Sequence, residues 1–78
     1  MSEKIPHGTT ARVLLALARA AHAKGTVMPT QEQIAQRIGR TPSAVYLVWR
    51  RLQAEGAVRA RVEFVGQFRR VFVEEVRG

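Results

Sequence analysis

The sequence contains no cysteine and no aspartate, and it has only two histidines. The missing thiols exclude disulfides, thiol nucleophiles, iron–sulfur clusters and cysteine-based zinc sites, and their absence is typical of a reducing compartment. His7 and His22 have no aspartate or cysteine to work with, so no pattern indicates an acid–base pair or a set of metal ligands. We therefore predict that the protein is not an enzyme and has no catalytic residue, no metal and no cofactor.

Long apolar segments are also missing. No run approaches the roughly 20 apolar residues that a membrane span needs, and the first residues lead into no signal-peptide core. We expect a soluble, cytoplasmic protein without membrane contact. The 78 residues allow one small domain. Residues 1–8 show no periodicity and are predicted to be a flexible arm, and residues 9–78 form the domain.

Positive charge is abundant. Thirteen lysines and arginines outweigh six glutamates, which gives a formal net charge of +7 at pH 7. Most of this excess lies between residues 37 and 70, where two glutamates accompany eight arginines, at positions 37, 40, 50, 51, 59, 61, 69 and 70. A polyanion is therefore the first partner to consider. The alternative is a charged surface that only keeps the protein in solution.

The first half of the chain has the pattern of two helices. Thr9 or Thr10 is a candidate cap for a helix that ends at Gly25. Its apolar positions recur at intervals of three and four, at Val13, Leu14, Leu17, Ala18 and Ala21. Residues 26–28 favour a short extended segment, which is a candidate third strand. Thr30 and Gln33 then have the spacing of a capping box, so a second helix is expected from residue 31 to Gly39.

A third helix is predicted from Pro42 to about Glu55, because Thr41 can cap it and proline is favoured at the first helical position. Its residues divide into two faces. One face is apolar and is formed by Val45, Val48, Trp49 and Leu52. The opposite face is formed by Ser43, Tyr46, Leu47, Arg50 and Arg51. We expect the first face, including Trp49, to belong to the core and the second to be free for binding.

Residues 57–76 are rich in β-branched residues and are broken at Gly66-Gln67, which predicts a hairpin. A two-residue loop places Glu63 opposite Arg70 and Arg59 opposite Glu74. The expected core face consists of Val58, Ala60, Val62, Phe64, Val71 and Val73. The other face carries an apolar patch of Val65, Phe68, Phe72 and Val76, which is a candidate contact for a partner protein or a second copy.

The order helix, helix, three-residue turn, helix, hairpin resembles a winged helix-turn-helix. Two spacings carry the resemblance: alanine, two variable residues, isoleucine and glycine at 35–39, and valine, leucine, glycine, alanine and valine at Val45, Leu52, Gly56, Ala57 and Val58. They resemble the DNA-binding modules of GntR-type and MarR-type bacterial transcriptional regulators over residues 9–76. The resemblance implies an α+β fold of three helices and a C-terminal two-stranded wing.

It also implies a function. The third helix would enter the major groove of double-stranded DNA, and the wing at 57–76 would contact the adjacent minor groove or the backbone. The implied DNA-binding residues are Arg40, Thr41, Ser43, Ala44, Tyr46, Leu47, Arg50, Arg51, Arg61, Arg69 and Arg70. Of the two arginines after the loop, we expect Arg69 to be more available for DNA, since Glu63 can form an ion pair with Arg70. A nucleoid-associated regulator acting as a homodimer is the resulting expectation.

Two alternatives stay open. Tyr46 and Leu47 stand where such regulators often carry polar or basic residues, so they and the apolar hairpin face also suit a protein-interaction module. A nonspecific binder of nucleic acid is the other alternative. Binding that weakens steeply with salt favours nucleic acid over an apolar partner, and indifference to base sequence marks the nonspecific binder.

Overall fold

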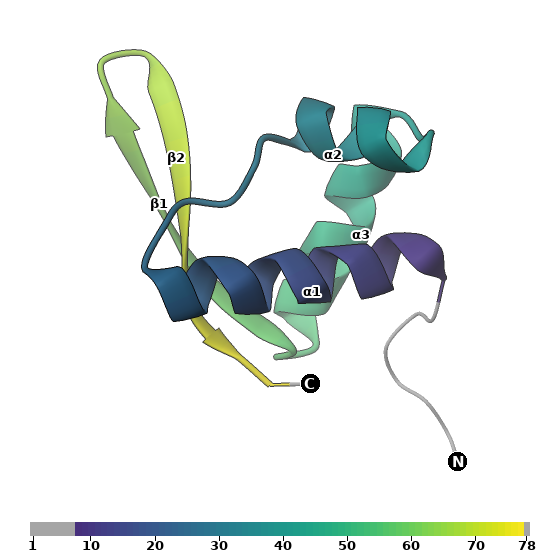
Figure 1. Cartoon of the computed structure of the whole chain (residues 1–78), viewed down its shortest axis with the longest axis horizontal. Helices are drawn as coiled ribbons and strands as arrows, with labels where there is room; N and C mark the ends of the chain where they lie inside the picture. Colours follow the sequence, from purple (N-terminus) through teal and green to yellow (C-terminus); the bar gives the residue numbers. More distant parts are fainter. Residues whose placement is uncertain (1–7, 78) are drawn as a thin grey trace.

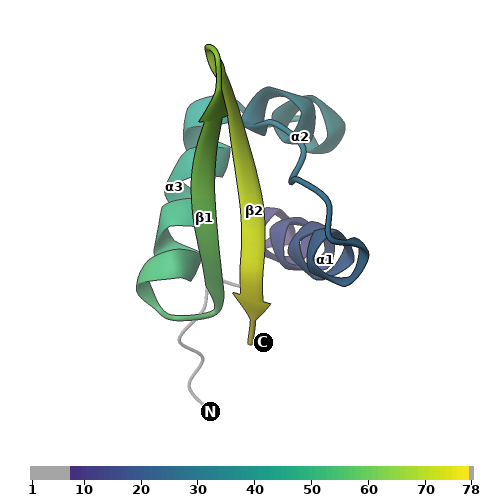
Figure 2. The ribbon, with the colours of Figure 1, turned by 90° about the vertical axis from the view of Figure 1, so that its left-hand side faces the viewer.

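The computed structural model of the chain describes residues 8–77. Three helices are followed by an antiparallel hairpin, which confirms the predicted α+β architecture. The elements are α1 (Thr9–Lys24), α2 (Gln31–Ile38), α3 (Pro42–Ala54), β1 (Val58–Val65) and β2 (Phe68–Val76). Figure 1 shows the helices as one body with the hairpin along one side, and Figure 2 shows β1 next to α3.

Local sequence explains where α2 and α3 begin. The Thr30 hydroxyl accepts a hydrogen bond from the Gln33 backbone at 3.1 Å, and the Thr30 backbone donates to the Gln33 side chain at 2.9 Å. This confirms the predicted capping box. The Thr41 hydroxyl likewise accepts from the backbone of Ala44 at 3.2 Å, and Pro42 occupies the first turn of α3.

The cap predicted for the first helix is wrong. Gly8 is the N-cap of α1, and no side chain caps this end. Thr10 lies inside the first turn and is only 7% exposed, so it packs against the core and does not cap the helix. The other end agrees with the sequence, because Gly25 has the left-handed conformation, and its N–H donates to Ala21 and His22.

The core lies where the helices meet the lower part of the hairpin. Leu14, Val45, Leu52 and Val58 are its largest fully buried side chains. Trp49 is 5% exposed, which confirms its predicted place in the core. These side chains come from α1, α3 and β1, so burying them holds the helices and the base of the hairpin together.

The hairpin has the predicted register near its loop. Val65 pairs with Phe68, and the pairing continues without a break to Ala60 and Val73. A register shift then occurs between Arg59 and Ala60. Arg59 consequently lies opposite Glu75, and its predicted position opposite Glu74 is wrong, since one extra residue of β2 is accommodated at the irregularity.

The segment before α2 touches the hairpin. Val27 forms a single antiparallel bridge with Phe72, and the Met28 N–H donates to the Val71 carbonyl at 2.8 Å. The third strand predicted at residues 26–28 is therefore reduced to a single bridge between Val27 and Phe72. His22 ties the end of α1 to the same strand, with its Nδ1 3.1 Å from the carbonyl oxygen of Val73.

Burial changes along the hairpin. Val58 and Val73 at its base are 2% and 8% exposed, whereas Val62 and Phe64 are 44% and 68% exposed. The predicted burial of these last two residues is wrong, because the hairpin leans away from the helices toward its tip and leaves both side chains exposed (Figure 1). Alternation predicted which face each residue occupies, but only the helices decide which part of that face is buried.

Among residues 8–77, no helix has the length and apolar character that crossing a membrane requires.

Candidate nucleic-acid interface

One face of α3 is uncovered. Ser43, Tyr46, Leu47 and Arg50 are all exposed, and Leu47 reaches 68%. The opposite side of the same helix carries the buried Val45, Trp49 and Leu52. Burial of that side fixes the rotation of α3 about its axis, so the polar and basic face must point outward. The sequence prediction of two faces is confirmed.

Arg50 and Tyr46 form a pair on this face. The Arg50 guanidinium donates a hydrogen bond to the Tyr46 hydroxyl at 3.1 Å. It also lies over the tyrosine ring, 5.7 Å from the centroid. The two residues are one helical turn apart, which makes the contact local. A guanidinium held in this way loses less side-chain freedom on binding a base edge than a free one does.

The turn between α2 and α3 places Arg40 and Thr41 at the end of the same face. Gly39, where the second helix was expected to end, has a φ of 72°, a left-handed conformation that favours glycine. The next N–H, from Arg40, donates to the carbonyl of Ala35 at 3.0 Å, which closes α2. Both Arg40 and Thr41 are exposed, and Thr41 also caps α3.

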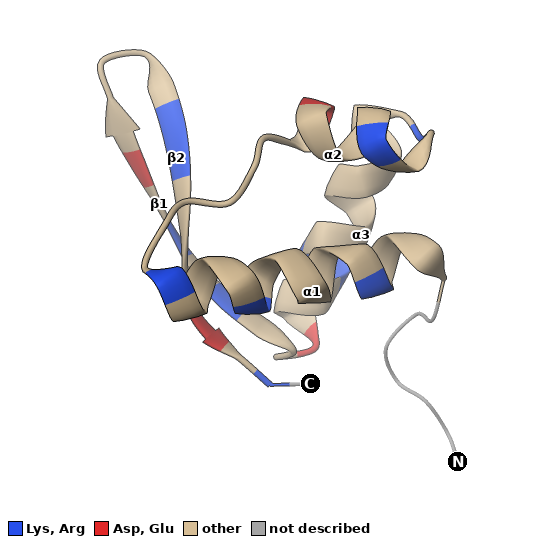
Figure 3. Ribbon diagram, in the orientation of Figure 1, with Lys and Arg blue, Asp and Glu red and all other residues tan. Residues whose placement is uncertain are grey.

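The other lysines and arginines are spread over the three helices and the hairpin (Figure 3). On the lower hairpin, Arg61 pairs with Glu63 and with Glu74, the latter at 3.3 Å, and it stacks 4.8 Å from the centroid of Phe72. Arg59 pairs with Glu74 and Glu75 at 3.7 and 3.5 Å. Their charges are therefore balanced within the hairpin. Phe72 is also partly covered, which reduces the predicted apolar patch.

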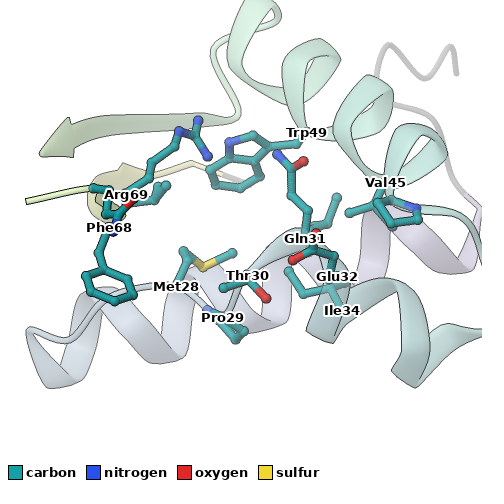
Figure 4. A pocket seen from close by; sticks show the side chains of 14 residues that line it. Met28, Pro29, Thr30, Gln31, Glu32, Ile34, Val45, Trp49, Phe68 and Arg69 are labelled. Atoms are coloured by element: carbon teal, nitrogen blue, oxygen red, sulfur yellow. The ribbon is translucent and has the colours of Figure 1, made fainter. Parts of the chain in front are cut away.

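Arg69 and Arg70 lie near the hairpin tip. Glu63 is opposite Arg70 in the register, as predicted, but its carboxylate pairs with Arg61. Within residues 8–77, neither Arg69 nor Arg70 has an ion-pair partner. Arg69 pairs with Phe64, on the side of the hairpin that faces the helices, and its side chain extends toward Trp49 (Figure 4).

Two residues that the sequence did not single out join these arginines. Arg37 of α2 lines a groove that also includes Arg69 and Arg70, and Gln31 lines a neighbouring cavity beneath Arg69. No spacing rule brings α2 next to the hairpin tip, because the two are about half the chain apart. In the sequence, Arg37 is notable only as the first arginine of the basic stretch at residues 37–70.

The described part of the chain holds no group of three His, Cys, Asp or Glu side chains suited to a metal ion. The structural features are instead those of a winged helix-turn-helix: α2, a three-residue turn, a helix with one free face, and a hairpin beside it.

A comparison with protein families gives the same class. Residues 10–66 match the model of the Crp-like helix-turn-helix domain, which is more than half of the chain. The chain therefore belongs to the Crp-like helix-turn-helix family and is a DNA-binding domain of the kind found in transcriptional regulation. The resemblance to GntR-type and MarR-type modules is not confirmed. No curated protein and no solved structure matches the chain significantly.

Proposed function

We propose that this domain binds double-stranded DNA in a sequence-specific manner, as a small transcriptional regulator, with α3 in the major groove. The observation that carries the proposal is the uncovered face of α3 on which Arg50 is held by Tyr46. Arginine donates two hydrogen bonds to the O6 and N7 edge of guanine, and an apolar side chain such as Leu47 suits a thymine methyl group. Arg40 and Ser43 supply further contacts at the entrance to the groove.

The hairpin supplies a second contact in this proposal. Arg70 is exposed near a tip that extends past the helices, and within residues 8–77 it has no acidic partner. The narrow minor groove has a strong negative potential that attracts guanidinium groups. We therefore assign Arg70 to the minor groove or backbone beside the site that α3 reads. Arg61 is given no such role, because Glu63 and Glu74 already neutralise it.

A second copy of the chain completes the proposal. One small module makes few contacts with DNA, whereas two linked modules reading two half-sites gain affinity from both. Val65 and Phe68 at the hairpin tip are 49% and 70% exposed and provide apolar surface for association. We expect a homodimer on a palindromic or repeated site, and sedimentation with and without the DNA site measures this directly.

The exposed Leu47 and Phe68 also favour a second candidate, a module that docks on another protein. The salt dependence of binding distinguishes these two functions. Binding to DNA weakens with a log–log slope of roughly −0.9 for each phosphate neutralised, whereas an apolar interface responds little.

The proposal is tested by selecting duplexes from a random pool at two salt concentrations. We expect one enriched motif at both concentrations and an affinity that falls steeply with salt. Enrichment of no motif, with equal binding to all duplexes, would leave only nonspecific binding. Absence of duplex binding at low salt would reject DNA as the ligand.

A further inference from the structure

A cavity lies between the hairpin, α3 and the start of α2 (Figure 4). Its volume is about 330 Å³, within the range of small-molecule sites. The apolar part of its lining includes Leu14, Met28, Ile34, Val45 and Val71. These side chains belong to the core or pack against it, so the core forms part of the cavity wall.

Polar groups meet at one side of this cavity. The side chain of Arg69 extends from β2 toward Trp49, and the nitrogen of the indole is on the side of the ring that faces it (Figure 4). The amide end of Gln31 lies beside the same ring. Three elements, β2, α3 and α2, thus each contribute one hydrogen-bonding side chain to one place.

Two of these groups are donors without an acceptor. Trp49 is 5% exposed, and within residues 8–77 its indole N–H makes no hydrogen bond. The nitrogen is not closed off in the interior, since no side-chain nitrogen or oxygen among the described residues is both fully buried and unpaired. Trp49 lines the cavity, and its nitrogen is on the side of the ring toward Arg69 (Figure 4). The Arg69 guanidinium also has no acidic partner there.

We propose that this cavity binds a small molecule with an apolar body and one carboxylate group. The carboxylate accepts hydrogen bonds from Arg69 and Trp49, and the apolar body lies on Met28, Ile34 and Val45. Two adjacent donors with no acceptor are satisfied best by an anion, because charge-assisted hydrogen bonds are the strongest available to them. No residue of this cavity is needed for the proposed major-groove reading by α3.

The charge of the lining selects a monoanion. Arg69 is the only cation among the lining residues, and the exposed Glu32 lies on the rim. A phosphate dianion would meet the repulsion of Glu32 with one guanidinium to offset it. A carboxylate needs a single cation, which Arg69 supplies, and the apolar side chains of the lining suit an apolar body.

Occupancy has a structural consequence. The carboxylate would tie the hairpin, through Arg69, to α3, through Trp49. The hairpin tip and α3 are the two parts proposed to touch DNA, so the ligand fixes one relative to the other. Ligand and DNA affinities are then coupled, and the coupling is the same in both directions.

Trp49 is the only tryptophan of the chain, so its fluorescence reports directly on the cavity. Octanoate is the probe, and octanol, which has the same chain without the carboxylate, is the matched control. We expect octanoate to produce a saturable change in Trp49 emission and a rise in melting temperature. Octanol should bind about 10- to 100-fold more weakly, the loss of one charge-assisted interaction.

Two arginine variants separate the cavity from general surface charge. Arg69→Gln should weaken octanoate about 10- to 100-fold, whereas Arg70→Gln, the same change one residue away on the other face of the hairpin, should have no effect. Trp49→Phe keeps an aromatic ring at this position and removes the N–H donor, so it should reduce the melting-temperature shift given by octanoate.

Three results would overturn the proposal. One is no saturable signal with octanoate up to about 10 mM, an affinity too weak for a built site. Another is equal binding of octanol and octanoate, which would mean apolar contact only. The third is equal weakening by Arg69→Gln and Arg70→Gln, which would mean general electrostatic attraction. None of these results bears on duplex selection, so the proposed DNA function stands or falls separately.

Discussion

The third helix and the hairpin each have a buried half and an exposed half, but the division runs in different directions. In α3 it runs along the helix, with Val45 and Trp49 on one face and Leu47 and Arg50 on the other. In the hairpin it runs across the strands, with a buried base and an exposed tip. The helix is thus held along its whole length, whereas the hairpin is held at its base and, through Val27 and Met28, at the middle of β2.

This difference separates stability from binding. The buried halves join α1, α3 and the base of the hairpin, and the free energy of folding depends on them. The exposed halves provide surface for binding, and substitutions in them should change the free energy of unfolding only slightly. A substitution in one half should therefore leave the property of the other half intact.

The largest expected effect on stability is at Trp49. Trp49→Ala should lower the free energy of unfolding by about 3–5 kcal/mol, because it removes a large side chain from the centre of a small core. Urea denaturation followed by circular dichroism measures this loss. Arg50→Ala, one residue further on the exposed face, is the control. A loss below about 1 kcal/mol for Trp49→Ala would show that the buried face of α3 is not what holds the fold.

The base and the tip of the hairpin can be compared with one kind of substitution. Val58→Ala should destabilise the protein by about 2 kcal/mol, since Val58 is 2% exposed. Val62→Ala is the matched change on the same strand and face and should cost less than about 0.5 kcal/mol. Thermal unfolding of both variants gives the difference. Equal losses would show that the tip is packed as tightly as the base.

A smaller effect tests the start of α2, which positions the turn before α3. Thr30→Ala should cost about 1 kcal/mol by removing the hydroxyl that accepts from Gln33. Thr9→Ala is the same change at the start of α1, where no side chain caps the helix, and it should have almost no effect. Chemical denaturation of both variants distinguishes them, and equal stabilities would contradict the assigned cap.

The sequence predicted the elements of this fold because their signals are local. Gly39 and Gly66 have the positive φ that their turns require, and Thr30 and Thr41 cap as their spacing indicates. Trp49 was placed in the core by helical periodicity. The prediction failed where burial depends on distant elements: Phe64 alternates like a core residue, but its side chain is exposed.

The site shows the same limit. The free face of α3 was predicted residue by residue, because a helix with one buried face must expose the other. Of the partners of the hairpin arginines, only Glu74 for Arg59 was predicted, since a side chain can choose among several acids within reach. Glu63 pairs with Arg61 instead of its cross-strand neighbour Arg70, and Arg69 turns toward the cavity. Such choices depend on three-dimensional packing that no spacing encodes.

The most direct test of the account compares two arginines of equal charge in duplex binding. Arg50 lies on the exposed face of α3, and Arg12 is exposed on α1. On the selected duplex, Arg50→Ala should weaken binding by about 10- to 100-fold, and on a scrambled duplex by much less. Arg12→Ala should weaken both duplexes slightly and equally. Equal losses for the two variants on the selected duplex would contradict the reading of DNA by α3.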